Sequence, residues 1–303
     1  MSVFEELESV TRAVADAAGP AIVGIGRGRG WGGSGIVVAA GQVLTNAHNL
    51  HGPEVAVSFA DGRKATGRVV GVDADGDLAV VAVDTADAAV IEWADQPAAL
   101  GTIVLALANP GGVGLRVTLG QVSATGQAFR GPRGRRIRGS IEHSAPLTKG
   151  ASGGAVVDRA GRLLGVNTNR LGEGFYLAIP ADADLRSRVE RLGRGESARR
   201  PHLGVALAPP QAARHLRQSV GLDERDGLLV RAVEDASPAA AAGLRTGDLL
   251  VAAGDRSLVA IDDLHDALSA AAGSTVVLRL VRGVEESEVT VTLGASEEAA
   301  SPG

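Results

Sequence analysis

The spacing of apolar residues changes along the chain, and each change marks a different kind of structure. In residues 3–18 apolar side chains recur every three or four positions, which predicts an amphipathic helix that packs on its own domain or contacts another copy. From residue 21 to about 180 they form short runs separated by Gly, Asp and Asn, as strands joined by tight turns do. Many short strands in succession indicate a mainly β fold, built as a sandwich or as barrels.

The pattern beyond residue 185 predicts a break and then a smaller domain. Residues 186–202 are charged and helix-forming until glycines interrupt them, so we interpret this segment as a linker. From Leu203 strands alternate with two helices, of which the first opens with Ser237-Pro238 and stops at Gly243. The expected organisation is an N-terminal helix at 1–20, a β domain at 21–185, a linker at 186–202, an α+β domain at 203–294 and a tail at 295–303.

Composition narrows the classes of function. The 303 residues suffice for two or three domains, and a net charge of −5 gives no reason to expect nucleic-acid binding. The chain has no cysteine, which excludes disulfides and thiolate metal sites. Residues 1–19 contain no long apolar run and carry several charges, so they predict neither a signal peptide nor a membrane span. We therefore expect a cytoplasmic protein, unless an N-terminal segment is missing from the sequence.

A serine in a glycine-rich bend is the first candidate for chemistry. Ser152 lies in the stretch 150–154, where a bend can point the N–H groups of Gly150 and Ser152 at one developing oxyanion. Gly-Ser turns are common, so an ordinary loop is the alternative for this motif alone. Two upstream residues favour the catalytic interpretation, because His48 and Asp77 precede Ser152 in the order of one known triad arrangement.

The three residue types divide the work of acyl transfer. A serine hydroxyl is a poor nucleophile at neutral pH, so Ser152 needs a base. Imidazole titrates near pH ~6.5 and suits His48 to that role, while Asp77 would hold the other ring nitrogen and stabilise the imidazolium. His51 and His143 compete for the role of base, and we interpret both as surface or structural residues. No two histidines have a metal-binding helical spacing with an acid between them, so we expect no metal and no cofactor.

Three other motifs suggest functions that the residues do not support. Residues 24–30 are rich in Gly but lack the Gly-Lys-Ser/Thr and the helix of a phosphate loop. Residues 73–77 are rich in Asp, but Leu78 and Asp84 stand where a calcium loop needs Gly and Glu. Arginines within 130–138, without interleaved aromatics, indicate a solvated loop or a regulatory contact with a neighbouring domain or subunit, rather than a nucleic-acid surface.

Taken together, the motifs resemble those of the HtrA (Deg) family of trypsin-like serine proteases, and they occur in the family's order. The choice of Asp77 among the three aspartates of residues 73–77 rests on this resemblance, since the family has its aspartate before Leu-Ala-Val. With a C-terminal part that is also similar, the likeness covers nearly the whole chain. The residues that carry it in the first part are Gly33-Ser34-Gly35, Leu44-Thr45-Asn46-Ala47-His48, Asp77-Leu78-Ala79-Val80, Asn109-Pro110-Gly111, Gly150-Ala151-Ser152-Gly153-Gly154 and Ala178-Ile179-Pro180.

The resemblance implies a fold, an activity and an assembly. It implies a chymotrypsin-like double β-barrel whose second barrel begins near residue 100, with His48 and Asp77 in the first barrel and Ser152 in the second. The implied activity is that of a serine endopeptidase, which cleaves unfolded or misfolded proteins in protein quality control. Members of the family often use an N-terminal segment to build a trimer, so a homotrimer is an expected assembly, although no segment here matches that one residue by residue. The family is often extracytoplasmic, unlike the location expected above.

The C-terminal part, residues 203–294, resembles the family's PDZ domain. Its landmarks are Ser237-Pro238-Ala239, Ala242-Gly243-Leu244 and Gly247-Asp248. A PDZ domain binds a peptide, often a protein C-terminus, as an added strand. The resemblance implies that this strand lies beside Leu203, Gly204 and Val205, with its carboxylate held by backbone N–H groups. Its last apolar side chain would contact Leu264 and Leu268; the alternative is that at least one of these leucines belongs to the core.

The sequence departs from the family pattern close to the serine. Ala151 stands where the family has an Asn that orients the loop, and Asn49 follows His48 in place of an aliphatic residue. Residues 145–149 differ from the usual run that, with residues 169–174, shapes the specificity pocket. No carboxylate is placed at the pocket base, so the sequence does not support cleavage after Lys or Arg. The resemblance implies cleavage after a small or medium apolar residue. The alternative function is a peptide-binding or holdase protein with a weak or latent protease domain.

Overall fold

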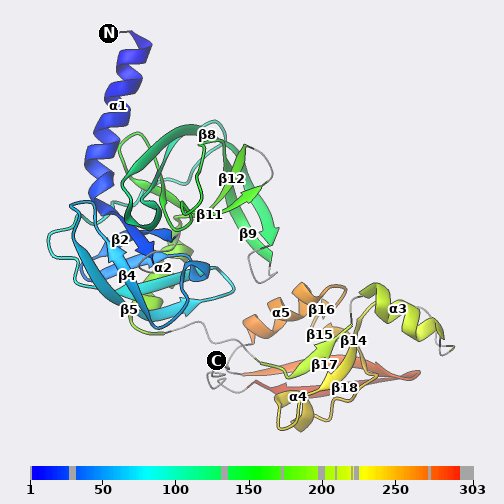
Figure 1. The fold of residues 1–303 in the computed structure, drawn as a ribbon. Coiled ribbons are helices and arrows are strands. Elements are labelled where there is room, and N and C mark those ends of the chain that lie inside the picture. Colours follow the sequence, from blue (N-terminus) through cyan, green and yellow to red (C-terminus); the bar gives the residue numbers. More distant parts are fainter. Residues whose placement is uncertain are drawn as a thin grey trace. The chain divides into compact units, whose positions relative to one another are not determined.

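A computed structural model describes most of the chain as two compact units, which divide between residues 198 and 199. Each unit is described by itself (Figure 1). The residues described are 2–26, 32–130, 136–171, 174–196, 202–208, 210–219, 221, 225–271 and 274–293. The glycine-rich loop expected at 24–30, the arginine-rich loop at 130–138 and the tail at 295–303 therefore lie partly or wholly outside the described residues.

The first unit opens with helix α1 (Val3–Ala18), as the apolar spacing predicts. Ser2 caps it: the Ser2 hydroxyl accepts from the N–H of Glu5, and the Glu5 carboxylate accepts from the N–H of Ser2. The second half of the helix packs against the barrels, where Val14 and Ala18 are buried and Val10 contacts the core. Val3 and Phe4 are each 78% exposed, and Figure 1 shows this end of the helix standing away from the barrels.

The first barrel closes through six antiparallel strands in the order β1-β2-β3-β6-β5-β4. Its apolar runs are the ones recognised in the sequence, and their side chains fill its interior. Gly35 is required where β2 crosses the core, because a Cβ there would lie 2.8 Å from the side chain of Val43. The strands are β1 (Ile22–Gly26), β2 (Gly33–Ala39), β3 (Gln42–Thr45), β4 (Glu54–Ser58), β5 (Lys64–Asp73) and β6 (Leu78–Ala82), with 3₁₀ turns η1 (Gly19–Ala21) and η2 (Ala47–Asn49).

The second barrel has the same strand number and closes in the order β10-β11-β12-β9-β8-β7. One cluster of buried side chains joins the two barrels, running from Ile25 and Leu44 to Leu107 and Val166. The mainly β, chymotrypsin-like double barrel is thereby confirmed. The strands are β7 (Ile103–Ala108), β8 (Arg116–Arg130), β9 (Arg136–His143), β10 (Ala155–Val157), β11 (Leu163–Leu171) and β12 (Phe175–Pro180), with the 3₁₀ turn η3 (Pro110–Gly112).

Helix α2 (Ala183–Gly193) follows the second barrel but packs on β5 and β6 of the first. Asp182 caps its N-terminus, and Leu185, Val189 and Leu192 are buried. The segment expected to be a linker from residue 186 is therefore helical at its start and belongs to the first unit. Helix-forming charged residues suggested a free connection, but three apolar residues at helical spacing give α2 a face to bury.

The second unit is a single sheet in the order β13-β14-β15-β17-β18, with β16 paired to β15. Ser237 caps α4 as its sequence predicts, accepting from the N–H of Ala240 at 3.1 Å. Helix α3 was not expected from the sequence. The elements are β13 (Val205–Leu207), α3 (Pro210–Ser219), β14 (Leu228–Val233), α4 (Pro238–Ala241), β15 (Leu249–Ala253), β16 (Arg256–Ser257), α5 (Ile261–Ala270), β17 (Thr275–Arg282) and β18 (Glu285–Thr292).

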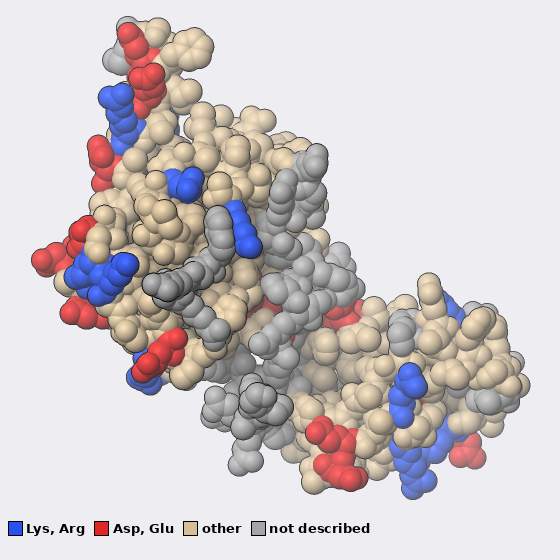
Figure 2. Space-filling model, viewed as in Figure 1, with Lys and Arg blue, Asp and Glu red and all other residues tan. Residues whose placement is uncertain are grey.

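The distribution of charged and apolar residues gives no sign of a nucleic-acid surface on the face shown in Figure 2, or of a membrane-spanning helix in the described parts of the chain. On the face shown in Figure 2 acidic and basic side chains are scattered and gather into no stripe of one sign. Within the described parts of the chain, no helix is both long and apolar enough to span a bilayer.

Candidate active site

His48 and Asp77 meet at one corner of the first barrel. His48 lies in η2, directly after β3, and Asp77 lies in the turn before β6. The Nδ1 of His48 is 2.8 Å from Oδ2 and 3.0 Å from Oδ1 of Asp77, and the backbone N–H of His48 donates to Oδ1 at 3.1 Å. Asp77 is 2% exposed, whereas the ring of His48 reaches the surface. Because Asp77 occupies Nδ1, the Nε2 of the ring is left for a second partner.

The backbone of Asp77 is held in an unusual conformation, with φ at +55°. A non-glycine residue rarely adopts this left-handed region without support. The side chain of Asn46 donates to the carbonyl of Asp77 at 2.8 Å. Just before it, Asp73 accepts from the N–H of Gly76 at 2.8 Å and pairs with Arg188 of α2 at 2.6 Å. The turn that presents Asp77 is therefore fixed from both sides.

Ser152 lies in the turn between β9 and β10, and its hydroxyl donates to the carbonyl of Thr168 at 3.1 Å. Its Oγ makes no hydrogen bond with His48, although both residues are in the described part of the chain. The structure thus unites two of the three predicted residues and leaves the hydroxyl of the third turned toward Thr168. Hydrogen bonds between catalytic groups are often long or absent before substrate binds.

Thr168 connects the two halves of the site, and sequence reasoning did not identify it. Its Oγ1 donates to Oδ2 of Asp77 at 2.7 Å, while its carbonyl accepts the Ser152 hydroxyl. Thr168 follows the core residues of β11 and is buried. Nothing in the local sequence marks it, because its contact with Asp77 spans 91 positions.

The turn around Ser152 leaves two N–H groups without an acceptor in the described structure, those of Gly150 and Ser152. Neighbouring groups are used: Ala151 donates to Thr148 at 3.1 Å and Gly153 donates to Asn167 at 2.7 Å. The φ of Gly150 is +87°, which only glycine adopts easily, and its carbonyl is turned to the hydroxyl of Ser34 at 2.8 Å. These are the two groups predicted to form an oxyanion hole.

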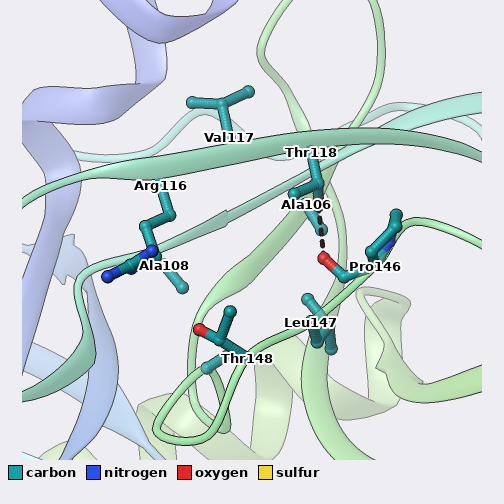
Figure 3. Close-up of a pocket in the computed structure, with 9 residues that line it drawn as sticks. Ala106, Ala108, Arg116, Val117, Thr118, Pro146, Leu147 and Thr148 are labelled. Atoms are coloured by element: carbon teal, nitrogen blue, oxygen red, sulfur yellow. Dashed lines mark hydrogen bonds between the residues drawn. The ribbon is translucent and has the colours of Figure 1, made fainter.

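A small cavity lies behind this turn (Figure 3). Its volume is about 250 Å³, and Ala151 lines it while Ser152 does not. Thr118 donates to the carbonyl of Pro146 at 2.7 Å across its wall. Among the described residues, the lining contains no acidic side chain. It consists of Ala106, Ala108, Arg116, Val117, Thr118, Pro146, Leu147, Thr148 and Ala151.

The competing histidines lie elsewhere. His143 is fully buried in the second barrel, where its Nε2 is 3.0 Å from the Oδ1 of Asn167 and its ring stacks on Tyr176. Burial lowers the pKa of His143, and the hydrogen bond to Asn167 opposes this only in part. His143 is therefore neutral and structural in this position. His51 is exposed in the loop after His48.

Comparison with known proteins decides the family. A trypsin-like peptidase domain matches residues 33–166, and a PDZ domain matches residues 201–293. The solved HtrA-type protease AlgW, bound to a decapeptide, superposes with a TM-score of 0.74 at 25% identity, over 95% of this chain and 99% of AlgW. This chain belongs to the HtrA (Deg) family of serine proteases.

Several relatives of this HtrA chain are known by sequence. The serine protease HhoB of Synechocystis is 31% identical over 281 residues, which cover 86% of this chain. The serine endoprotease DegS of Escherichia coli is 28% identical over 277 residues, which cover 86% of this chain and 76% of DegS. The chain spans 66% of the length of HhoB, and 56% of the DegP-like periplasmic serine endoproteases of Pseudomonas fluorescens and Halomonas elongata.

The PDZ unit of this HtrA protein presents β13 as an edge strand, paired on one side with β14. Gly204, just before it, has a φ of +79°, and a Cβ there would lie 2.1 Å from that of Ser237. The N–H groups of Leu203 and Gly204 have no acceptor among the described residues. Leu264 and Leu268 on α5 are only 2% and 4% exposed and belong to the cluster of buried side chains of the PDZ unit.

Proposed function

We propose that this chain is a serine endopeptidase in which Ser152 attacks the peptide carbonyl, His48 moves the proton and Asp77 orients His48. The N–H groups of Gly150 and Ser152 stabilise the oxyanion. The observation that carries the proposal is the buried Asp77 carboxylate on Nδ1 of His48, together with a turn in which two N–H groups have no acceptor among the described residues. Family membership supports the same chemistry.

The geometry sets the direction of proton transfer. A proton on Nδ1 of His48 is held by Asp77, so Nε2 carries the free electron pair. Ser152 must then rotate its hydroxyl from the carbonyl of Thr168 to this nitrogen before it can attack. Nε2 takes the hydroxyl proton as the C–O bond forms and returns it to the leaving amine as the C–N bond breaks. The contact with Thr168 therefore describes the enzyme before substrate binds.

The substrates we propose are unfolded or misfolded polypeptides, with C-termini captured by the PDZ unit. A peptide would pair with the free edge of β13, and its carboxylate would receive the N–H groups of Leu203 and Gly204. Since Leu264 and Leu268 are buried, a peptide side chain reaches them only if α5 moves away from the sheet.

A homotrimer is the assembly we propose, and α1 supports it. Val3, Phe4 and Leu7 expose apolar surface on the part of the helix that extends from the barrels. Sedimentation of the full chain tests this proposal. A cytoplasmic location stays a prediction, because DegP-like relatives are named periplasmic, and fractionation of the producing cell would test it.

Labelling with a fluorophosphonate tests the enzyme proposal, because the probe reacts only with an activated serine. We expect the purified chain to be labelled and the Ser152→Ala variant to remain unlabelled and folded. A peptide with an apolar C-terminus should raise the labelling rate if the PDZ unit regulates the site. A folded chain that takes no label, with or without the peptide, would instead be a peptide-binding protein with a latent protease domain.

A further inference from the structure

The side chain of Asn49 reaches from the histidine segment to the nucleophile turn. Asn49 ends η2, directly after His48. Its Nδ2 donates to the carbonyl of Ser152 at 2.9 Å and to Oγ1 of Thr45 at 3.0 Å, so both of its N–H bonds are used. One carboxamide therefore links the residue next to the proposed base with the residue that is the proposed nucleophile, across 103 positions of sequence.

Two glycines make room for this carboxamide. A Cβ on Gly33 would lie 2.2 Å from both Cγ and Nδ2 of Asn49, and a Cβ on Gly153 would lie 3.1 Å from its Nδ2. Gly33 could not carry a side chain without moving Asn49, and a Cβ on Gly153 would crowd Asn49 while lying only 2.1 Å from the carbonyl oxygen of Ser34. This close fit indicates that the position of the half-buried carboxamide is constrained on both barrels.

The carbonyl of Ser152 has a second donor from the same barrel. The N–H of Ser34 in β2 donates to it at 2.8 Å. With Asn49 and Ser34 both on this oxygen, the peptide that follows Ser152 is fixed against the first barrel. The peptide that precedes Ser152 carries one of the two proposed oxyanion donors, and the two peptides meet at the Cα of Ser152. Holding one of them limits the rotation of the other.

We propose that Asn49 is a positioning residue. It fixes the position of the nucleophile turn of the second barrel relative to the histidine segment of the first. The inference rests on the proposed function. Its consequence is that Ser152 and its oxyanion donor keep a fixed place relative to His48, even though the two barrels contribute them separately. Asn49 acts through Ser152 and touches no substrate in this role.

The test compares two replacements of similar size. Asn49→Leu removes both donors, and Asn49→Asp replaces them with a carboxylate that repels the carbonyl of Ser152. We expect kcat on fluorescently labelled casein, and the fluorophosphonate labelling rate, to fall about tenfold for Asn49→Leu and about a hundredfold for Asn49→Asp. KM and the melting temperature should stay close to those of the wild type. Gln96→Leu, which removes an exposed carboxamide in the loop between β6 and β7, is the matched control and should keep the full rate.

A pH series separates positioning from a merely structural role. When the carboxyl introduced by Asn49→Asp takes up a proton, it can again donate to the carbonyl of Ser152. The rate of this variant relative to wild type should therefore rise as pH falls from about 8 to about 5. The relative rate of Asn49→Leu should stay flat. Relative rates near one for both variants would overturn the proposal, as would losses that only track a lowered melting temperature. An unlabelled wild type would refute the proposed function itself, which is a separate outcome.

Discussion

The aspartate corner (His48 and Asp77) and the nucleophile turn (residues 149–154) are built on opposite plans. At the corner the Asp77 carboxylate accepts three hydrogen bonds, from the His48 ring, the His48 N–H and the Thr168 hydroxyl, and only Nε2 of His48 is left for a further partner among the described residues. In the turn, two N–H groups have no acceptor within the described structure, and the Ser152 hydroxyl donates to an uncharged carbonyl. The Asp77–His48 pair is formed before substrate binds, whereas the N–H groups and the hydroxyl of the turn are available to interact with substrate.

The two regions also differ in what holds them. His48 and Asp77 are 29 positions apart and belong to one barrel. The turn is held by β11 of its own barrel and also from the other barrel, by Ser34 to Gly150 across 116 positions and by Asn49 to Ser152. The His48–Asp77 pair is therefore made within the first barrel and receives one further hydrogen bond from Thr168 of the second, while the position of the turn depends on several hydrogen bonds between the two barrels. Changes at the two regions should differ in their effects on rate and on stability.

The largest expected effect comes from breaking the corner. In Asp77→Asn an amide can donate to Nδ1 of His48 and so favours the wrong tautomer, which should lower kcat about 10⁴-fold with little change in KM. Steady-state kinetics on labelled casein measures this. Asp75→Asn, in the same aspartate-rich turn, should keep kcat within a few-fold of wild type. If the two variants were equally impaired, the choice of Asp77 as the orienting residue would be wrong.

Replacing Ser34, which holds the nucleophile turn, should lower the rate less than Asp77→Asn does and should lower the stability more. The hydroxyl of Ser34 accepts from the N–H of Asn109 at 3.0 Å and donates to the carbonyl of Gly150. Ser34→Ala removes the partner of the buried Asn109 N–H and of the half-buried Gly150 carbonyl, so the free energy of unfolding should fall by about 2 kcal/mol and kcat by about tenfold. Urea unfolding and kinetics measure the two. Ser9→Ala, at an exposed position of α1, is the control, and equal losses in it would refute this account.

The smallest expected effect is a loss of stability at acidic pH. Burial lowers the pKa of His143 below that of an unfolded histidine, near pH ~6.5, so the unfolded chain takes up the proton first. The stability that neutral His143 contributes is complete above that pH and declines below it, by at most about 1.4 kcal/mol per pH unit. Asn167 links His143 to Gly153 of the turn. Protonation of His143 should therefore destabilise the turn before it destabilises the corner.

Unfolding curves between about pH 7 and about pH 5 measure the decline, and His143→Gln should flatten it. The PDZ unit provides an internal comparison. Burial raises the pKa of the Asp248 carboxyl, but Arg282 and the N–H of Arg245 outweigh it and the net pKa is below its usual value. The contribution of Asp248 is thus present above about pH 4 and lost only as pH falls through its lowered pKa. A PDZ unit that weakened first on acidification would contradict this order.

The sequence predicted residue types and order well, and contacts between distant strands poorly. Ser152, His48 and Asp77 stand in motifs with recognisable neighbours, and the apolar runs predicted the strands of the barrels. Thr168 could not be found, because its place beside Asp77 arises only when the two barrels dock. Asn49 was noticed as a departure from the family pattern, but its role needs the carbonyl of Ser152 in place.

The burial of apolar helix residues is a second feature that their spacing in the sequence does not predict. Leu264 and Leu268 occupy one helical face, and a face that lines a groove has the same spacing as one that fills a core. The structure places both in the core. In α2, three apolar residues stand among charged ones, so the sequence did not predict a buried face. They are buried because α2 packs on β5 and β6.

Helix α2 also decides where this molecule can be divided and rejoined. Its Arg188 holds Asp73, and through that turn it supports the strained backbone of Asp77, although it follows the last strand of the protease barrels. A catalytic fragment cut after Pro180 would contain every proposed catalytic residue and still lack this support. Any exchange of the PDZ module, whether in the laboratory or by recombination of genes, must therefore leave residues 183–193 with the barrels.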